Sequence, residues 1–178
     1  FNDNVMGDVV DTLLLSWKYY GEPRFLEAVR KAGDFIILSQ RPEPQPIWAQ
    51  QYDLEMRPAW ARKFEPASVC AGESVGVMRC LIRIWLETGE ERYLKPIPPA
   101  LAWYRRSQIA PNRWARFYEL ETNRPLYFTT KYELVYTDHD LPTHYSFQGP
   151  YGVAEMITEY EQVSKLGLEK TRALRSRK

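Results

Sequence analysis

The sequence is poor in the residue types that mark several large classes of protein. It contains only two cysteines and two histidines among 178 residues. Cys70 and Cys80 fall in one predicted helix, roughly 15 Å apart along its axis, so we expect no disulfide between them. No apolar run is long enough to cross a bilayer. The net charge is only +1, which gives no general attraction to nucleic acid or to anionic membranes.

The residues that are present suit a folded domain rich in aromatic side chains. Hydrophobic residues make up 44% of the sequence and aromatic residues 14%, which is enough to bury a core. The chain opens at Phe1 without a methionine. We therefore expect a monomeric single domain over residues 1–178 that is part of a longer chain.

Apolar spacing predicts two helical hairpins that resemble each other. Apolar residues recur at helical intervals in residues 3–20 and 23–40. They recur in the same way in residues 68–107, where Gly89 separates the two helices. Trp17 matches Trp85 and Gly21 matches Gly89, both at the offset 85 − 17 = 68. Because prolines at 96, 98 and 99 interrupt the match, we expect the last helix to start late. Repeated hairpins need neighbours to bury their apolar faces, by stacking or by closing into a ring.

The pattern changes after residue 108. Aromatic and β-branched residues predict short strands at 116–120, 125–128 and 132–137, and a helix returns at about 151–163. The sequence thus divides into two repeated helical hairpins (1–108), a strand and loop region (109–150), and a final helix with a polar tail (151–178) that we expect to fray at its end.

The longest connection, residues 48–74, has the composition of a binding loop for an acidic sugar. Long connections within compact domains are often functional. An arginine fork matches a carboxylate, and flat aromatic faces suit sugar rings. The residues of these kinds are Trp48, Tyr52, Trp60, Gln50, Gln51, Asp53, Arg57, Arg62 and Lys63. The alternative is that the aromatic side chains pack in the core and the charged ones are merely solvated.

Four motifs in this order resemble the family 10 polysaccharide lyases, the pectic acid lyases. The motifs are Phe1-Asn2-Asp3, Trp48-Ala49-Gln50-Gln51, Ala61-Arg62-Lys63-Phe64-Glu65 leading to Gly72-Glu73-Ser74, and Trp114-Ala115-Arg116-Phe117-Tyr118 with Thr122-Asn123-Arg124-Pro125. The resemblance covers roughly the first 125 residues. It implies a mainly α fold, an incomplete (α/α) toroid of helical hairpins with a few short strands after residue 110, of which this chain is the C-terminal portion. It also implies a secreted or periplasmic enzyme that cleaves polygalacturonate by β-elimination with Ca²⁺.

The resemblance assigns roles to three residues. Asp3 matches an aspartate of the calcium and substrate centre, Arg62 the arginine that acts as Brønsted base, and Arg116 an arginine of the substrate groove. A second acidic residue of the centre is expected before Phe1. The further substrate-binding residues that we predict are Trp48, Gln51, Arg57 and Lys131.

Two departures from the family pattern point to a divergent member with altered substrate or reduced activity. Thr130-Lys131-Tyr132 stands where the family shows Arg-Asp-Gly, so a substrate-binding arginine is lost unless Lys131 substitutes for it. The stretch 141–145, Leu-Pro-Thr-His-Tyr, replaces a Glu-Arg-Arg-x-Gly-Tyr motif.

Several of these residues also allow simpler interpretations. Asp3 could cap the first helix, and Arg116 could be a structural ion-pair or cation–π residue. Glu65 and Glu73 could orient Arg62 or cap a helix. Trp60 and Trp114 could be sugar platforms, although we expect at least one in the core.

A local cluster of potential metal ligands, Asp138-His139-Asp140 with His144, lacks a recognised spacing. It could hold a transition metal or be a solvated loop at the edge of the groove.

Two other functions compete with the lyase. A glycoside hydrolase on a similar toroid would need a pair of carboxylates, for which Asp53 with Glu65 or Glu73 are the candidates in the loop. A degenerate relative would bind acidic polysaccharide without cleaving it.

Overall fold

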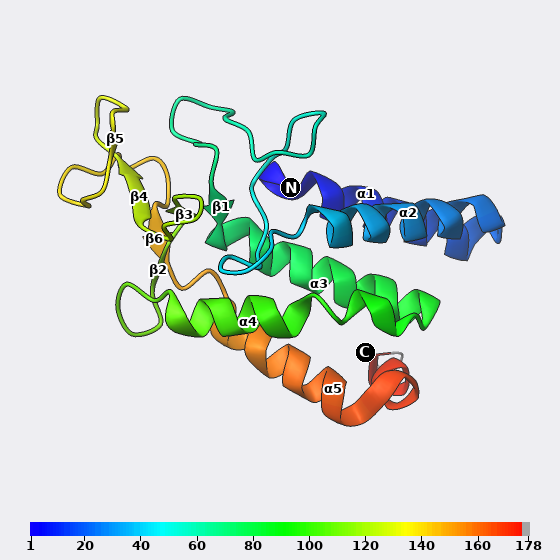
Figure 1. The fold of residues 1–178 in the computed structure, drawn as a ribbon. Coiled ribbons are helices and arrows are strands. Elements are labelled where there is room, and N and C mark those ends of the chain that lie inside the picture. Colours follow the sequence, from blue (N-terminus) through cyan, green and yellow to red (C-terminus); the bar gives the residue numbers. More distant parts are fainter. Residues whose placement is uncertain (176–178) are drawn as a thin grey trace.

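The computed structural model describes residues 1–175 and combines a helical part with a region of short strands (Figure 1). The helical elements are the 3-10 turns η1 (Asn2–Asn4) and η2 (Glu91–Tyr93) and the α-helices α1 (Val5–Tyr20), α2 (Pro23–Ser39), α3 (Ala71–Thr88), α4 (Ile97–Arg106) and α5 (Val153–Arg175). The strands are β1 (Val69–Cys70), β2 (Trp114–Ala115), β3 (Phe117–Tyr118), β4 (Pro125–Phe128), β5 (Leu134–Val135) and β6 (Gln148–Gly149). Within residues 1–175, none of the helices has both the length and the apolar character that a bilayer crossing requires.

The two predicted hairpins are present, as α1–α2 and α3–α4. Gly21 ends α1 with φ 69° and Gly89 ends α3 with φ 74°, a left-handed conformation that favours glycine. Their amides donate to the carbonyls of Trp17 (2.8 Å) and Trp85 (2.7 Å). The equivalent helix ends confirm the offset of 68 residues. The late start of the last helix is also confirmed, because α4 begins only at Ile97.

Helix α3 is the central helix of the molecule, and its packing fixes the position of its first turn. It packs against α1 and α2 on one side and α5 on the other (Figure 1). Eleven of its side chains are buried, and each buried aliphatic side chain contributes roughly 1.5–3 kcal/mol. The first turn of α3, which carries Gly72 and Glu73, is thereby held in place.

The C-terminal helix is longer than predicted. α5 continues to Arg175 through a bend at Gly167. Thr171 is buried, and the Arg172 Nε donates to the Leu86 carbonyl at 2.6 Å, at the end of α3. The prediction that the tail frays is therefore wrong up to Arg175, and residues 176–178 lie outside the described part of the chain.

The strands form two antiparallel sheets at one end of the helices (Figure 1). The larger sheet has the order β1-β3-β4-β5, and β2 pairs with β6. β1 pairs with β3 through Val69↔Tyr118 and Cys70↔Phe117.

The prediction of a mainly α, incomplete (α/α) toroid of helical hairpins with a few short strands after residue 110 is wrong. Residues 1–175 form a helix-dominated fold with two sheets, and β1 precedes residue 110. A strand of two residues is too short to produce a recognisable alternation of side chains. Its partner β3 is also remote in the sequence, so no local turn marks the pair.

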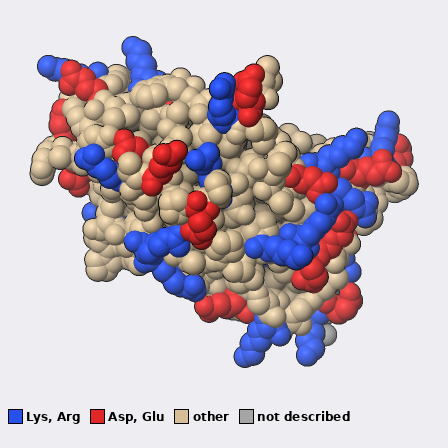
Figure 2. Space-filling model, viewed as in Figure 1, with Lys and Arg blue, Asp and Glu red and all other residues tan. Residues whose placement is uncertain are grey.

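Charged side chains of both signs are mixed over the surface. On the face shown in Figure 2, lysines and arginines lie beside aspartates and glutamates, most visibly over the helical part. Many form ion pairs, among them Lys18–Glu87 at 2.5 Å and Arg83–Asp11 at 2.7 Å. The mixture agrees with the net charge of +1.

Candidate functional site

The first feature of the site is a direct contact between Asp3 and Arg62. Asp3 lies in η1, whose Asn2 amide donates to the Gln50 carbonyl at 3.0 Å. Arg62 lies in the loop between α2 and β1, and its guanidinium donates to the Asp3 carboxylate. The side chains are 62% and 47% exposed, so the pair faces solvent. Asp3 and Arg62 are thus brought together on one accessible surface, and Asp3 does not cap α1, whose N-cap residue is Asn4.

Glu65 holds Arg62 from beneath. Its side chain is completely buried. It accepts hydrogen bonds from Arg62 Nη1 (3.2 Å), Gln50 Nε2 (2.9 Å), Asn2 Nδ2 (3.2 Å) and the Tyr145 hydroxyl (3.1 Å). A buried carboxylate is costly unless donors of this kind satisfy it. The interpretation that Glu65 orients Arg62 is therefore confirmed.

These two carboxylates determine the protonation of Arg62. The hydrogen bond to Asp3, followed by the charge of Glu65, raises the pKa of Arg62 above its ordinary value. The guanidinium is therefore a firmly protonated cation. This suits an anion clamp directly and makes loss of a proton harder.

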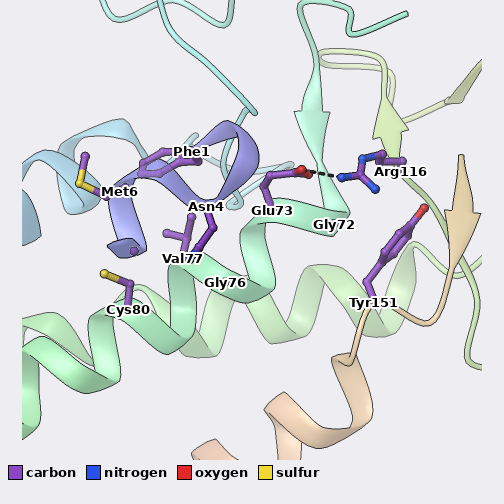
Figure 3. A pocket seen from close by; sticks show the side chains of 11 residues that line it. Phe1, Asn4, Met6, Gly72, Glu73, Gly76, Val77, Cys80, Arg116 and Tyr151 are labelled. Carbon is purple, nitrogen blue, oxygen red and sulfur yellow. Dashed lines mark hydrogen bonds and ion pairs between the residues drawn. The ribbon is translucent and has the colours of Figure 1, made fainter. Parts of the chain in front are cut away.

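Arg116 forms a second, more enclosed ion pair. It lies between β2 and β3, and its Nη2 donates to the Glu73 carboxylate at 2.6 Å (Figure 3). The two side chains are 18% and 10% exposed. The guanidinium carbon lies 4.6 Å from the Tyr145 ring centroid and 5.8 Å from that of Tyr151. Burial, the largest single cause, lowers the pKa of Arg116, but the charge of Glu73 together with Cys70, Tyr145 and the hydrogen bond to Glu73 outweighs it, and the net pKa is raised.

The ion-pair and cation–π contacts that the simpler interpretation of Arg116 expects are thus present, and its place in the substrate groove stays a prediction. Glu73 orients Arg116 and not Arg62, so that part of the prediction is wrong.

A pocket of about 230 Å³ opens beside the Glu73–Arg116 pair (Figure 3). It lies between the start of α1, the first turns of α3, and Tyr151. A Cβ atom at Gly72 would lie 3.3 Å from Arg116 Cζ, so the missing side chain lets the guanidinium approach the start of α3. Within residues 1–175, the buried Arg116 Nε has no hydrogen-bond partner.

Three of the other predicted binding residues in the central loop are committed to contacts within the fold. Trp48 is 0% exposed and its Nε1 donates to the Ile36 carbonyl at 2.8 Å, so its prediction as a substrate-binding residue is wrong. Gln51 Nε2 donates to the Ala59 carbonyl at 2.7 Å. Arg57 pairs with Asp53 at 2.9 Å on an exposed turn. None of the three forms a hydrogen bond or ion pair with Arg62 or Arg116.

Lys131 is exposed on the turn before β5. It makes no ion pair within residues 1–175, and no contact places it beside Arg62.

The two tryptophans that could be sugar platforms differ in exposure. Trp114 is 4% exposed and its Nε1 donates to the Tyr104 carbonyl at 2.8 Å, which confirms the expectation that at least one belongs to the core. Trp60 is 52% exposed and its ring meets Phe128 edge-on at 5.9 Å. Its face is therefore available to a ligand.

Of the two interpretations left open for Asp138-His139-Asp140 with His144, the structure does not favour a transition-metal site. Asp138 accepts a hydrogen bond from Gln148 (3.2 Å) and Asp140 accepts one from Thr130 (3.1 Å). His144 packs edge-on against Phe64 at 5.1 Å. Over residues 1–175, no three His, Cys, Asp or Glu side chains gather as a set of metal ligands. For calcium, Asp3 offers one carboxylate, and the dependence on Ca²⁺ stays a prediction.

Sequence reasoning missed two members of the site, Asn2 as a donor to Glu65, and Tyr145 as a donor to Glu65 and a cation–π contact of Arg116. Asn2 lies beside Asp3 in a motif that the sequence does display. Tyr145 has no local signal, because the contact joins it to a residue 80 positions earlier.

Comparison with known families identifies the chain. The pectic acid lyase family matches residues 1–113. The chain therefore belongs to the pectic acid lyase family.

Two solved structures are similar to it, a family 10 polysaccharide lyase from Cellvibrio cellulosa and its D189A mutant in complex with trigalacturonic acid. Each has 23% identity and a TM-score of 0.76, over 92% of this chain for the mutant and 93% for the other. The chain spans 62% of the length of those proteins. No curated protein matches.

Proposed function

We propose that this chain carries part of the active site of a pectate lyase that cleaves polygalacturonate by β-elimination. Membership of the pectic acid lyase family supports the reaction class. The trigalacturonic acid complex of the similar Cellvibrio mutant supports the substrate class. The observation that carries the proposal is the meeting of Asp3 and Arg62 on one exposed surface, although they lie 59 positions apart in the sequence.

The reaction requires a cation at the place that Arg62 occupies. Elimination removes the C5 proton, which is α to the uronate carboxylate, and expels the sugar linked through O4. Negative charge grows on the carboxylate as the proton leaves, and a fixed cation stabilises it. We propose that Arg62 faces C5, that its guanidinium first gives one proton to water, and that the neutral guanidine then receives the C5 proton and becomes the cation beside the uronate carboxylate. If substrate binding breaks the hydrogen bond to Asp3, the pKa of Arg62 falls towards its ordinary value, which is the direction that a base requires.

We propose that the reaction also depends on Ca²⁺, with Asp3 as one of its ligands. Calcium prefers carboxylate oxygens, and bound calcium would neutralise charge on the uronate. The proposal also includes export from the cell, because a polymeric substrate of this size does not cross a membrane.

The experiment is an assay on polygalacturonate with two readouts and a chelator. Ultraviolet absorbance of an unsaturated product, lost with EDTA and restored with CaCl₂, is the expected result. Reducing sugar without that absorbance would mean hydrolysis and would overturn the proposal. Binding of polygalacturonate without any product would indicate the non-catalytic relative.

The non-catalytic alternative has one specific observation in its favour. Arg62 and Arg116 are each already paired with carboxylates, so a substrate must displace these partners before it can use either guanidinium. The hydrolase alternative has less support. Glu65 is completely buried, and Asp53 is held by Arg57 on an exposed turn.

A further inference from the structure

Tyr145 is placed beside the site by the smaller sheet. It precedes β6, which pairs with β2 through Trp114↔Gly149 and Ala115↔Gln148. The ladder continues with the Arg116 amide, which donates to the Phe147 carbonyl at 2.7 Å. The strand register therefore places Phe147 opposite Arg116 and brings the preceding segment, which contains Tyr145, alongside it.

The Tyr145 hydroxyl contacts Glu65, the buried carboxylate that holds Arg62. It donates to Glu65 Oε1 at 3.1 Å and accepts from Gln50 Nε2 at 3.4 Å. Burial raises the pKa of Tyr145, so the phenol keeps its proton and remains a donor. The Glu65 oxygen that receives this bond is the one that pairs with Arg62 Nη1. Loss of the hydroxyl would leave that oxygen freer to move, and Arg62 with it.

The Tyr145 ring acts on Arg116. Its centroid lies 4.6 Å from the guanidinium carbon, within the range of a cation–π interaction. The ring is itself fixed by Phe64 at 4.7 Å and Phe147 at 5.1 Å. The flat face of Arg116 that is not used for hydrogen bonding thus lies on a rigid aromatic surface.

We propose that Tyr145 is a positioning residue that holds both arginines, Arg62 through its hydroxyl and Glu65, and Arg116 through its ring. The kinetic part of this proposal rests on the proposed lyase function, whereas the geometric part does not. Tyr145 lies in the stretch 141–145 where the sequence departs from the pectic acid lyase pattern. This stretch therefore supports the site even though it lacks the arginines of that pattern.

Two variants of the intact protein separate the two contacts. Tyr145→Phe removes the hydroxyl and keeps the ring, and Tyr145→Leu removes both. The matched control is Tyr132→Phe. Tyr132 stacks on the same Phe64 ring at 5.6 Å, but its hydroxyl makes no hydrogen bond within residues 1–175.

Each variant is assayed for elimination on polygalacturonate and for hydrogen exchange at the arginine Nε–H groups by NMR, with thermal unfolding as a check of folding. For Tyr145→Phe we expect kcat to fall roughly tenfold with little change in KM, and exchange to speed up at Arg62 but not at Arg116. For Tyr145→Leu we expect a higher KM as well, and faster exchange at both arginines. Tyr132→Phe should match the wild type.

Wild-type exchange at Arg62 in Tyr145→Phe would overturn the proposal, as would identical behaviour of the two Tyr145 variants. If the wild type shows no elimination, the proposed function fails, and the exchange measurements still decide whether Tyr145 positions the arginines.

Discussion

Arg62 is held between an exposed carboxylate and a buried one. Asp3 contacts one nitrogen of its fork from the solvent side, and Glu65 contacts another from within the fold. Glu65 has other donors and cannot leave, whereas Asp3 is free to exchange partners. The arrangement therefore holds Nη1 of the fork in place and leaves Nη2 available to a uronate that displaces Asp3.

Replacement of Arg62 tests its role directly. We expect Arg62→Ala to lower the rate of elimination by roughly 100- to 10,000-fold, the usual contribution of a positioned proton acceptor. Stability should fall by only about 1 kcal/mol, because Glu65 keeps three other hydrogen-bond donors. Product absorbance and denaturant unfolding measure the two effects. Lys63→Ala is the control, since Lys63 is exposed and makes no ion pair within residues 1–175. Retained activity in Arg62→Ala would remove Arg62 as the base.

Trp48 and Trp60 offer a contrasting pair, one in the core and one at the surface. Trp48→Phe should cost about 2 kcal/mol of stability, through lost volume and the lost hydrogen bond to Ile36, and leave KM unchanged. Trp60→Phe should change stability by less than about 0.5 kcal/mol and raise KM if its exposed face binds sugar. Denaturant unfolding and the KM for polygalacturonate separate them. A raised KM with unchanged stability in Trp48→Phe would contradict its placement in the core.

At the scale of elements, one charge cluster ties the two hairpins together. Glu90, just before η2, accepts from Arg30 of α2 at 2.7 Å and from Arg92 at 2.9 Å. The hydrogen bond from Arg30 contributes most to lowering the pKa of Glu90 below its ordinary value. A lowered pKa in the folded state means that the ionised form stabilises the fold.

This gives a pH-dependent prediction. The contribution of Glu90 is fully present above the ordinary glutamate pKa of about 4.3 and is lost as the pH falls through the lowered value of the folded state. Glu90→Gln should therefore reduce the free energy of unfolding by about 0.5–1 kcal/mol at neutral pH, and the difference from wild type should shrink in acid. Glu27→Gln, on the exposed face of α2, should show no such trend. A deficit that stays constant down to acid pH would contradict the assignment.

The helices were accessible to sequence reasoning, and so were β3, β4 and β5, which lie within the predicted strands 116–120, 125–128 and 132–137, whereas β1, β2 and β6 were not. Apolar spacing and the glycines at 21 and 89 predict where α1 and α3 end, because these signals are local. β1 and β2 contain two residues each and pair with segments far along the chain. The resemblance to a known family placed Asp3 and Arg62 together. No pattern in the sequence revealed that Tyr145 reaches Glu65, because this contact also joins distant segments.

At the scale of the whole molecule, positive and negative charges are balanced, and many of the charged side chains form ion pairs. The chain has 24 lysines and arginines against 23 aspartates and glutamates, and both signs are mixed on the face shown in Figure 2. Long-range attraction of an acidic polymer is therefore weak. The division into domains and the monomeric state stay predictions.

The affinity for substrate should accordingly depend little on salt. Between about 0.05 M and about 0.2 M NaCl, we expect the KM for trigalacturonate to change less than about threefold. In the proposed function, short contacts at Arg62 and Arg116 bind the substrate, and long-range electrostatic attraction contributes little. Steady-state kinetics at constant calcium provide the measurement. A loss of tenfold or more would point to a strongly basic groove.

The residues of the candidate site all lie in loops or at the ends of elements, whereas the interiors of the helices supply mainly apolar packing. A lineage with this architecture can exchange one apolar residue for another inside its helices without moving the rim that meets the polymer. Conversely, a change of two or three residues in the loops can give a new specificity on an old framework. The stretches 130–132 and 141–145, which depart from the family pattern, are where we expect such changes of specificity first.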